Sequence, residues 1–593
     1  MTAGSAPREL ELKFQLDDTA RARLAGAGLS PQAATSVKRL TSTYWDTPDG
    51  ALLAARVALR VRRTPEGFVQ TVKAEGDGPF DRFEWEAPVS SERPERDALP
   101  PETTAPGKVA HTALDRLAPM FTTDFERTAW RLVPNAALQV EVAMDLGEVR
   151  ADGVVPRRIC EIEAECLSGT PIAFWQWATR FAARHRLRLG YATKNERGLR
   201  LAGRLPALPS PVKAAEVEGA GRAAPDPDAT AAVAAARAAR ACIAHFAANV
   251  DPLLETEHPS AAHQLRVALR RLRAVVRFFG LGAIDPGWQE VETQARALAD
   301  AAGKLRDADV FAAGTLAALR EALPGDPAID ALHAALTRAQ QADRVAAREM
   351  VSGVAATRLV LQAMLLAARL ERAPGRRVAV DPRDARRQRF ADFAALQVAD
   401  AYARLRKRAK RADDAESWHR ARIAGKNLRY AIEFAESALP KPKQVRQAAD
   451  RLAELQELLG AANDAEVAAE VATRLLRADA GRGNGGDRAG GGGGGSHGQA
   501  TASVDATRAV ALIEGWAAHG RAMQGKKMKA RARKLVAQLE DDLARTLERA
   551  EALRVLHAEQ ARLAASAAVG RSAAATPEPQ AQSTHATTPV SEG

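Results

Sequence analysis

The sequence predicts an α+β multidomain protein, in which an N-terminal antiparallel β region precedes a C-terminal all-α region made of a duplicated helical bundle. The chain of 593 residues is longer than the roughly 250–300 residues at which a single hydrophobic core stops growing. Up to about residue 200 apolar residues alternate with charged ones, and beyond about residue 229 they recur every three or four residues. We therefore place the β domain in residues 1–204 and the helical domain in residues 229–545.

Several predicted strands carry charged residues at every second position, mostly of one type within a strand. These residues are Glu9, Glu11 and Lys13; Arg60 and Arg62; Glu84 and Glu86; and Glu161, Glu163 and Glu165. In a strand such residues share one face. A solvated face explains any single strand, but the segregation by residue type favours a closed barrel whose lumen offers carboxylates to divalent cations and Arg/Lys to phosphates. An empty lumen would cost several kcal/mol per unpaired buried charge, by rough estimate, whereas a metal-bound polyphosphate neutralises both sets.

The order of these motifs resembles the CYTH domain family, also called the triphosphate tunnel metalloenzymes. The motifs are ELELK (9–13) in the ExExK pattern, TYWDTPD (43–49), LRVRR (59–63), VK ending at Lys73, RFEWE (82–86), FTTDFERTAW (121–130), EIEAE (161–165) and ATKNERG (192–198). The resemblance covers residues 7 to about 203. It implies an eight-stranded antiparallel tunnel that hydrolyses or cyclises triphosphates with Mg²⁺ or Mn²⁺.

The resemblance also assigns roles by position. Catalytic roles are implied for Glu9, Glu11 and Lys13. Phosphate-binding roles are implied for Lys13, Arg60, Arg62, Lys73, Arg127 and Lys194, and metal-binding roles for Glu9, Glu11, Glu161 and Glu163. Glu84, Glu86 and Glu165 are secondary candidates. The implied chemistry is phosphoryl transfer to water, in which positioning and charge neutralisation dominate.

Three segments have the composition of linkers or disordered chain. Residues 205–228 are rich in Pro, Ala and Gly, which predicts a linker between the two domains. Residues 479–502 contain a glycine-rich run that cannot bury enough apolar surface to fold. The last residues, 566–593, are rich in Ala, Ser, Thr, Pro and Gln, and we expect this tail to be disordered as well.

A basic stripe occurs twice in the helical region. In residues 263–279 the basic positions are His263, Arg266, Arg270, Arg273 and Arg277, and in residues 419–435 they are His419, Arg422, Lys426 and Arg429. Six of the seventeen aligned positions are identical at an offset of 156 residues. GKLRDADV (303–310) and GAANDAEV (460–467) repeat at an offset of 157. This internal duplication predicts two antiparallel bundles, roughly 229–375 and 383–545, that bring their basic helices to a common surface.

The basic stripes favour an anionic ligand. A charged stripe on an isolated helix is ordinarily a solvated face, but the stripe from residue 263 to 277 contains five Arg and no acid. The segment resembles the CHAD domain, an α-helical module named for its histidines, often fused behind CYTH and implicated in binding inorganic polyphosphate. The resemblance implies polyphosphate contacts at His263, Arg266, Arg270, Arg273, His419, Arg422, Lys426 and Arg429. A structural role for the two histidines is an equally open alternative, and Asp307 and Asp464 are expected to cap helices or pair with Arg.

Charge and cysteine content narrow the class of partner and compartment. The chain has 85 basic and 73 acidic residues, a net charge of +12, of which residues 1–200 contribute only 28 against 27. The basic excess in the remainder points to a polyanionic partner, and the lack of interleaved aromatic residues makes nucleic acid unfavourable. Three scattered cysteines exclude a disulfide framework or a zinc site. With no signal pattern and no uninterrupted membrane-length apolar stretch, we expect a cytoplasmic protein without a membrane partner.

The leading hypothesis is a metal-dependent inorganic triphosphatase that converts tripolyphosphate to diphosphate and phosphate and binds polyphosphate with its helical domain. One alternative is a non-catalytic polyphosphate-binding or targeting protein. Another, within the CYTH family, is activity on an organic triphosphate, as in a thiamine triphosphatase or an adenylyl cyclase. The sequence leaves the choice of metal, the chain length of the substrate and the oligomeric state open.

Overall fold

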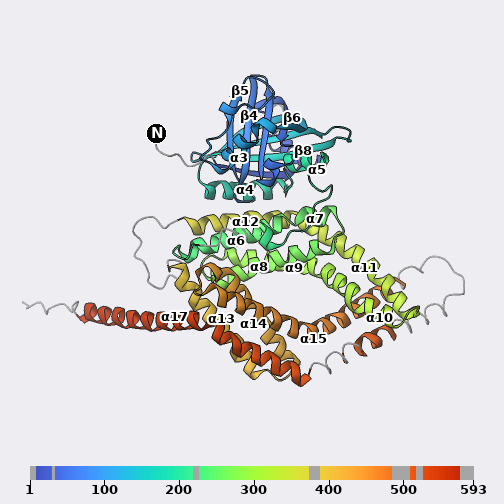
Figure 1. Ribbon diagram of the computed structural model, residues 1–593, viewed down its shortest axis with the longest axis vertical. Helices are drawn as coiled ribbons and strands as arrows, with labels where there is room; N and C mark the ends of the chain where they lie inside the picture. The colour runs from blue at the N-terminus through green and yellow to red at the C-terminus, as the bar shows by residue number, and fades with distance from the viewer. Residues whose placement is uncertain are drawn as a thin grey trace, which may run out of the picture.

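A β-barrel domain is stacked on a larger helical domain (Figure 1). The computed structural model describes residues 8–29, 34–217, 226–372, 388–483, 508–515, 518 and 525–573. The barrel strands are β1 (Arg8–Gln15), β2 (Ser36–Asp46), β3 (Val57–Thr64), β4 (Gly67–Gly78), β5 (Asp81–Val89), β6 (Ala118–Asn135), β7 (Leu138–Arg150) and β8 (Arg157–Ser168). They pair in the order β5-β4-β3-β2-β6-β7-β8-β1, and β1 pairs again with β5. The predicted closed eight-stranded antiparallel barrel is thus confirmed, with the short β9 (Arg188–Leu189) added beside β1.

Short helices close the barrel and cover its outside. They are α1 (Asp18–Gly26), α2 (Ala51–Ala54), α3 (Ala105–Ala113), α4 (Pro171–His185) and α5 (Lys194–Leu201). Helix α5 packs against β6, β7 and β8. Gly198 makes this close approach possible, because a Cβ at that position would lie 2.0 Å from the Phe121 ring. Leu199 joins Phe121 and Phe125 in an apolar cluster, so one side of the barrel interior is filled by hydrophobic side chains.

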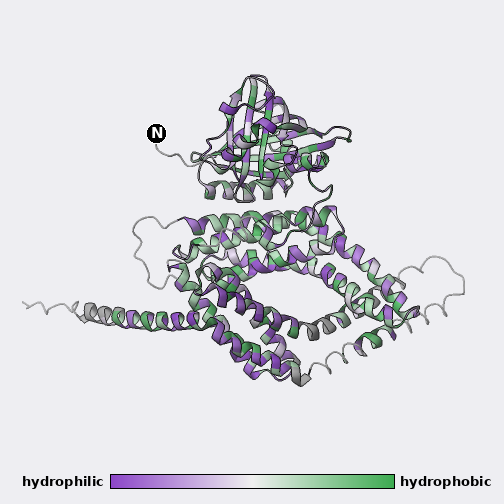
Figure 2. Ribbon diagram, viewed as in Figure 1, coloured by the Kyte–Doolittle hydropathy of each residue, from purple (hydrophilic) through white to green (hydrophobic). Residues whose placement is uncertain are grey.

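The two domains share an extensive apolar contact. Helix α4 lies on α12 (Val354–Glu371), which is largely hydrophobic (Figure 2). Residues of both domains, including Trp175 and Leu359, belong to one buried cluster, and the Leu189 amide donates to the Thr357 hydroxyl at 2.9 Å. The described part of the predicted linker, residues 205–217, docks as well, because Asn249 both accepts from the Val212 amide at 3.0 Å and donates to its carbonyl at 2.9 Å.

The helical domain contains the predicted duplication. In the first half, α6 (Ala231–Ala247), α8 (Pro259–Phe278), α9 (Gly287–Phe311) and α12 pack together, joined by α7 (Val250–Glu255), α10 (Ala317–Ala322) and α11 (Pro327–Val351). In the second half, α13 (Phe390–Arg411), α14 (Ala415–Ala435), α15 (Pro442–Gly483) and α17 (Gly525–Ala573) make the equivalent contacts. Helices α8 and α14 begin at residues 259 and 415, which reproduces the offset of 156 residues found in the sequence.

Two predicted boundaries differ from the structure. Helix α15 continues to Gly483, past the expected start of the disordered insertion at 479, and α17 continues to Ala573, past the expected start of the disordered tail at 566. The second extension contains three Ala among its eight residues, and Ala is the best helix former. The rest of the predicted insertion and tail lies outside the described residues. Within the described chain, one single helical segment, Ala231–Glu255, is apolar and long enough to span a membrane, and 61% of its window is buried inside the protein.

Candidate functional site

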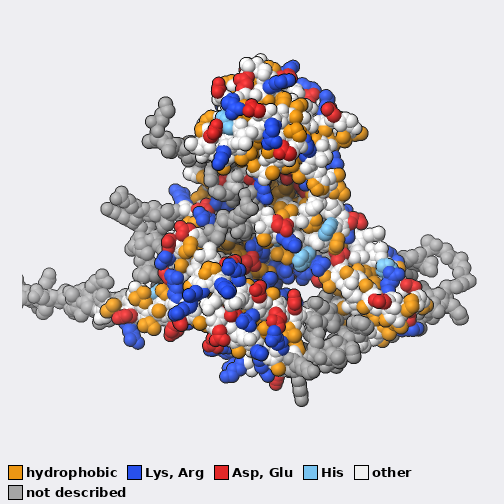
Figure 3. Space-filling view, viewed as in Figure 1, with side chains coloured by type: hydrophobic (Ala, Val, Ile, Leu, Met, Phe, Trp, Pro, Cys, Tyr) orange, Lys and Arg blue, Asp and Glu red, His pale blue; other side chains and the backbone are white. Residues whose placement is uncertain are grey.

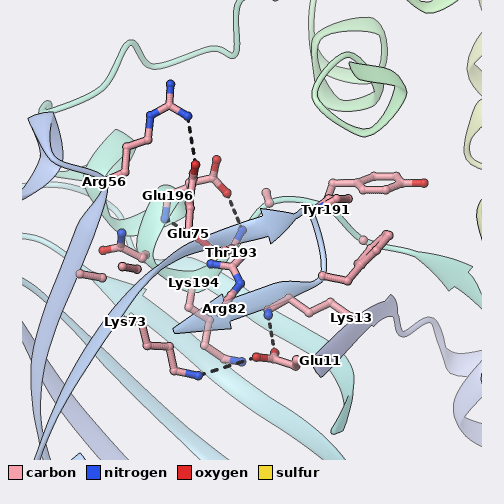
Figure 4. A pocket seen from close by; sticks show the side chains of 18 of the residues that line it. Glu11, Lys13, Arg56, Lys73, Glu75, Arg82, Tyr191, Thr193, Lys194 and Glu196 are labelled. Carbon is pink, nitrogen blue, oxygen red and sulfur yellow. Dashed lines mark hydrogen bonds and ion pairs between the residues drawn. The ribbon is translucent and has the colours of Figure 1, made fainter. Parts of the chain in front are cut away.

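The barrel lumen is the charged part of a cavity of about 750 Å³ that extends to the helical domain (Figure 4). Because side chains alternate along each strand, the charged face of every predicted strand points inward. All the tunnel residues predicted from the sequence line this cavity, with the exception of Glu161: Glu9, Glu11, Lys13, Arg60, Arg62, Lys73, Glu84, Glu86, Arg127, Glu163, Glu165 and Lys194. Their arrangement divides the lumen into two carboxylate groups and one basic wall.

The first carboxylate group, which we call the β1 acid cluster, consists of Glu9, Glu11, Glu84 and Glu165. Lys73 lies 2.7 Å from Glu9, 3.0 Å from Glu84 and 3.7 Å from Glu11. Burial and the neighbouring Glu9 and Glu84 carboxylates raise the pKa of Glu165 to about 8, and burial raises the pKa of Glu9. Lys13 pairs with Glu11, and Arg60 lies 3.9 Å from Glu84. The pKa of Glu84 is lowered against the effect of burial, by a hydrogen bond with Glu9 and by Lys73. The four carboxylates therefore share three cations.

The second group consists of Asp145, Glu161 and Glu163, whose ligand atoms all lie within 4.8 Å of one another. Here the positive charge is abundant. Lys194 lies 2.6 Å from Asp145 and 2.8 Å from Glu163 and also pairs with Glu161. Arg127 forms a bidentate pair with Asp145 at 2.8 and 2.7 Å and contacts Glu163, and Arg197 pairs with Glu161. The cations Lys194 and Arg127 hold the pKa of Glu163 well below its usual range, despite its burial.

The basic wall lies on β3, across the barrel from β8 in the strand order. Arg60 faces Glu84 and Glu86 at 3.9 and 3.7 Å. Arg62 donates to the Ser42 hydroxyl at 3.3 Å and forms no ion pair with any residue that the structure describes. Burial and the nearby Arg60 and Arg127 lower the pKa of Arg62 to about 10. The guanidinium is thus a half-buried cation that has no ion pair within the described part of the chain.

These contacts test whether a divalent cation fits the lumen. The four predicted metal residues do not form one set, because Glu9 and Glu11 lie with Glu84 and Glu165, while Glu161 and Glu163 lie with Asp145. Carboxylate oxygens are suitable ligands for Mg²⁺ and Mn²⁺. A cation fits the β1 acid cluster by charge, since its carboxylates exceed its cations, whereas in the second group it would have to displace Lys194.

Sequence reasoning missed three residues of the site. Asp145 is buried in the second group. Strand β7 also carries Glu141 and Glu148, but these acids do not stand at every second position, so no such pattern marked Asp145. Arg197 lies within the quoted ATKNERG motif but was given no role. Tyr44 lies within TYWDTPD, and its hydroxyl hydrogen-bonds Arg60, whose charge lowers the pKa of this buried phenol.

The basic stripes of α8 and α14 also come together. Arg271 of α8 pairs with Glu433 of α14 at 2.6 Å. Burial, followed by the charges of Arg422, Arg270 and Arg266, lowers the pKa of Lys426 to about 8. Side chains of Lys and Arg gather around the hollow on this face of the helical domain (Figure 3). The predicted common basic surface is therefore present.

The stripe is less isolated than its sequence indicated, since α9 supplies acids to it. Asp307 pairs with Arg266 at 2.7 Å, as expected for this residue, and Glu292 lies 2.8 Å from Arg277 and 3.9 Å from Arg273. His263 is half-buried, and desolvation together with Arg306 and Arg270 lowers its pKa to about 4. His419 is exposed. The side chain of Asp464 lies outside the described residues.

Comparison with known proteins follows the same division into two domains. The sequence model of the CYTH domain matches residues 7–199, and that of the CHAD domain matches residues 237–473. An inorganic triphosphatase from Haemophilus influenzae is 30% identical over 166 residues, which are 27% of this chain and 45% of that protein. The chain thus matches less than half the length of this relative.

Two solved structures resemble the two parts of the chain. The crystal structure of the CHAD domain from the plant Ricinus communis is 28% identical, with a TM-score of 0.42, and covers 55% of this chain and 96% of its own. A putative adenylyl cyclase from Hippeastrum, described as having a dominant triphosphatase activity, is 17% identical, with a TM-score of 0.23, and covers 32% and 94%.

Proposed function

We propose that this chain, which contains a CYTH domain at residues 7–199 and a CHAD domain at residues 237–473, hydrolyses inorganic triphosphate to diphosphate and phosphate with a divalent cation. We propose further that its helical domain binds inorganic polyphosphate. The CYTH domain and the similarity to an inorganic triphosphatase support an activity of the triphosphatase type. That the substrate is inorganic triphosphate is part of this proposal.

The charge imbalance of the lumen carries the proposal. On one wall Arg62 is a half-buried guanidinium with no carboxylate partner in the described structure. On the other, the four carboxylates of the β1 acid cluster share the three cations Lys13, Lys73 and Arg60, and burial raises the pKa of Glu9 and Glu165. A triphosphate bound with a divalent cation supplies anionic oxygens to the first and positive charge to the second. Each partner removes a desolvation cost that the empty lumen carries.

The residues of the chain then have separate tasks. Arg62 and Arg60 bind phosphate oxygens and stabilise the charge that develops on them during transfer to water. Lys13 and Lys73 lie between the carboxylates and the substrate and hold both in register. Glu9, Glu11, Glu84 and Glu165 would hold the metal, which supplies charge neutralisation and a polarised water when bound. The acids of the second group pair with Lys194, Arg127 and Arg197 and so stabilise the shape of this part of the lumen.

The proposal is tested by phosphate release from tripolyphosphate, ATP, thiamine triphosphate and long-chain polyphosphate, each with Mg²⁺ and with Mn²⁺. We expect tripolyphosphate to give the highest kcat/KM and chelation to abolish turnover. Glu84→Gln should raise the metal concentration needed for half-maximal rate, while Glu126→Gln, on an exposed position of β6, should not. A higher kcat/KM for an organic triphosphate would replace the inorganic substrate, and absence of turnover on all four would leave only a binding function.

Polyphosphate binding by the helical domain is supported by the cations of α8 and α14. Burial and the charges of Arg422, Arg270 and Arg266 lower the pKa of Lys426, so cations of both helices lie near this ammonium group, and Asp307 of α9 pairs with Arg266. Replacing Arg270, Arg422 and Lys426 by Glu should abolish retention of long-chain polyphosphate while triphosphate turnover persists. A matched triple substitution to Glu at the exposed Arg404, Lys407 and Arg411 of α13 is the control, and an equal loss there would reduce the effect to net charge.

A further inference from the structure

The catalytic cavity continues beyond the barrel and ends against the helical domain. Its lining includes the start of β3, the end of β4 and the start of β5, all at one end of the barrel. The same cavity is lined by Leu205, Pro209 and Val212 of the segment between the domains and by Ala244 and Asp251 of α6 and α7. This end of the tunnel is therefore built by both domains, and the close-up shows Tyr191 on the side where the helices approach (Figure 4).

The helical domain presents a carboxylate to this mouth. Asp251, in the first turn of α7, is half-buried and lines the cavity. Burial, followed by the carboxylates of Glu255 and Glu196, raises its pKa to about 6, while Arg200 and Arg197 act in the opposite direction. At pH 8 the group is therefore an anion close to the path of any chain that leaves the lumen here.

The contact between the domains holds Asp251 in place. Asn249, two residues earlier, is fully buried and bonds to Val212 in both directions. His245, one turn before Asn249, is also buried and lies 3.1 Å from the Val212 carbonyl. The α6–α7 elbow, and with it the backbone next to Asp251, is thus hydrogen-bonded to the segment that leads out of the barrel.

We propose that the helical domain sets the chain length accepted by the tunnel, with Asp251 as the specificity-determining residue that opposes phosphates extending past the mouth. The inference rests on the triphosphatase function proposed above and adds a rule for its substrate. In this proposal a triphosphate occupies the part of the cavity lined by Lys13, Arg62 and Lys73, and a longer chain extends toward the part lined by Asp251. Like charges at close range in a partly buried site repel strongly.

The test compares tripolyphosphate with tetrapolyphosphate in the full-length protein at pH 8. The variants are Asp251→Asn, which removes the charge, and Asp251→Lys, which reverses it. Glu255→Gln is the control, because Glu255 lies on the same helix and is exposed but does not line the cavity. We expect the ratio of kcat/KM for tetrapolyphosphate to that for tripolyphosphate to rise several-fold in Asp251→Asn and about tenfold or more in Asp251→Lys, and to stay unchanged in Glu255→Gln.

Three outcomes decide the inference. A higher ratio of kcat/KM for tetrapolyphosphate to that for tripolyphosphate in the Asp251 variants, with tripolyphosphate turnover near wild type, supports it. A purely structural defect would lower the turnover of both substrates together. An unchanged ratio, or a parallel loss on both substrates, overturns it. If the wild type hydrolyses neither compound, the proposed function fails instead. Calorimetric titration of the same proteins with the two polyphosphates without metal then decides the chain-length rule, and equal affinity ratios in all variants would refute it.

Discussion

Neighbouring arginines on β3 should have opposite effects on stability when each is replaced by Gln. Arg62 is a half-buried cation whose described partner is the Ser42 hydroxyl, whereas Arg60 faces Glu84 and Glu86. Arg62→Gln should therefore stabilise the protein without ligand and remove triphosphate turnover. Arg60→Gln should destabilise it, because Glu86 loses its ion-pair partner and Glu84 keeps only Lys73.

The magnitude follows from the electrostatics of the lumen. Burial, Arg60 and Arg127 lower the pKa of Arg62 from 12.5 to about 10. At about 1.4 kcal/mol per pH unit, this difference corresponds to about 3 kcal/mol of unfavourable free energy for the charged group. Loss of the aliphatic stem and part of its packing offsets about 1 kcal/mol of the gain. We expect Arg62→Gln to raise the free energy of unfolding by about 1–2 kcal/mol and to lower kcat/KM by about 100- to 1000-fold.

Both quantities are measurable on the full chain without metal or phosphate. Five of the eight tryptophans lie in residues 1–204, so tryptophan fluorescence during urea or thermal unfolding reports mainly on the barrel. Added tripolyphosphate should then raise the melting temperature of the wild type more than that of Arg62→Gln. The reasoning is refuted if Arg62→Gln destabilises the protein as much as Arg60→Gln, or if it retains wild-type turnover.

Three further predictions concern other parts of the molecule. Lys194→Met should lower the free energy of unfolding by about 3–5 kcal/mol, because three buried carboxylates lose their shared cation; a melting temperature within a degree of wild type would contradict the pairing. Polyphosphate retention should weaken with salt. Replacing Arg270 and Lys426 by Glu should make the slope of log binding constant against log salt concentration shallower by roughly 0.7–0.9 for each lost contact, by analogy with nucleic acids. A filter assay over a series of salt concentrations measures this slope. Burial lowers the pKa of His245 to about 4, so the folded protein keeps this side chain neutral. As the pH falls from about 6.5 toward 4, the unfolded chain binds the proton first, and the free energy of unfolding should therefore decrease. The decline in melting temperature over that range should be smaller in His245→Gln, and equal slopes would exclude this source.

Local patterns predicted most of the elements. Alternation of charged and apolar residues marked the inward face of β1, β3, β5 and β8, whereas Lys73, Arg127 and Lys194 were identified by the family resemblance. Steps of three and four residues marked the basic faces of α8 and α14, and their spacing of 156 residues revealed the duplication. These features depend on residues adjacent in the chain, which is why the sequence carries them.

The tertiary structure decides which of those charged residues form ion pairs with one another. Strand register places Lys13 opposite Glu163 and Glu11 opposite Glu165, and no sequence pattern determines register across a closed barrel. It separates the four predicted metal ligands into two groups and brings Asp145 to Lys194. The acids of α9 reach the α8 stripe for the same reason, since a helix face does not specify its neighbour.

The sequence by itself determined which side chains face the tunnel and which form the basic stripes, because a side chain's face follows from the period of its own strand or helix. Only the tertiary structure decided which charges are neutralised, which lack an ion pair among the described residues, as at Arg62, and that Asp251 of α7 lines the same cavity. Those outcomes depend on distances between residues far apart in the chain, and at such distances the free energy of a charge is set by its neighbours and its burial.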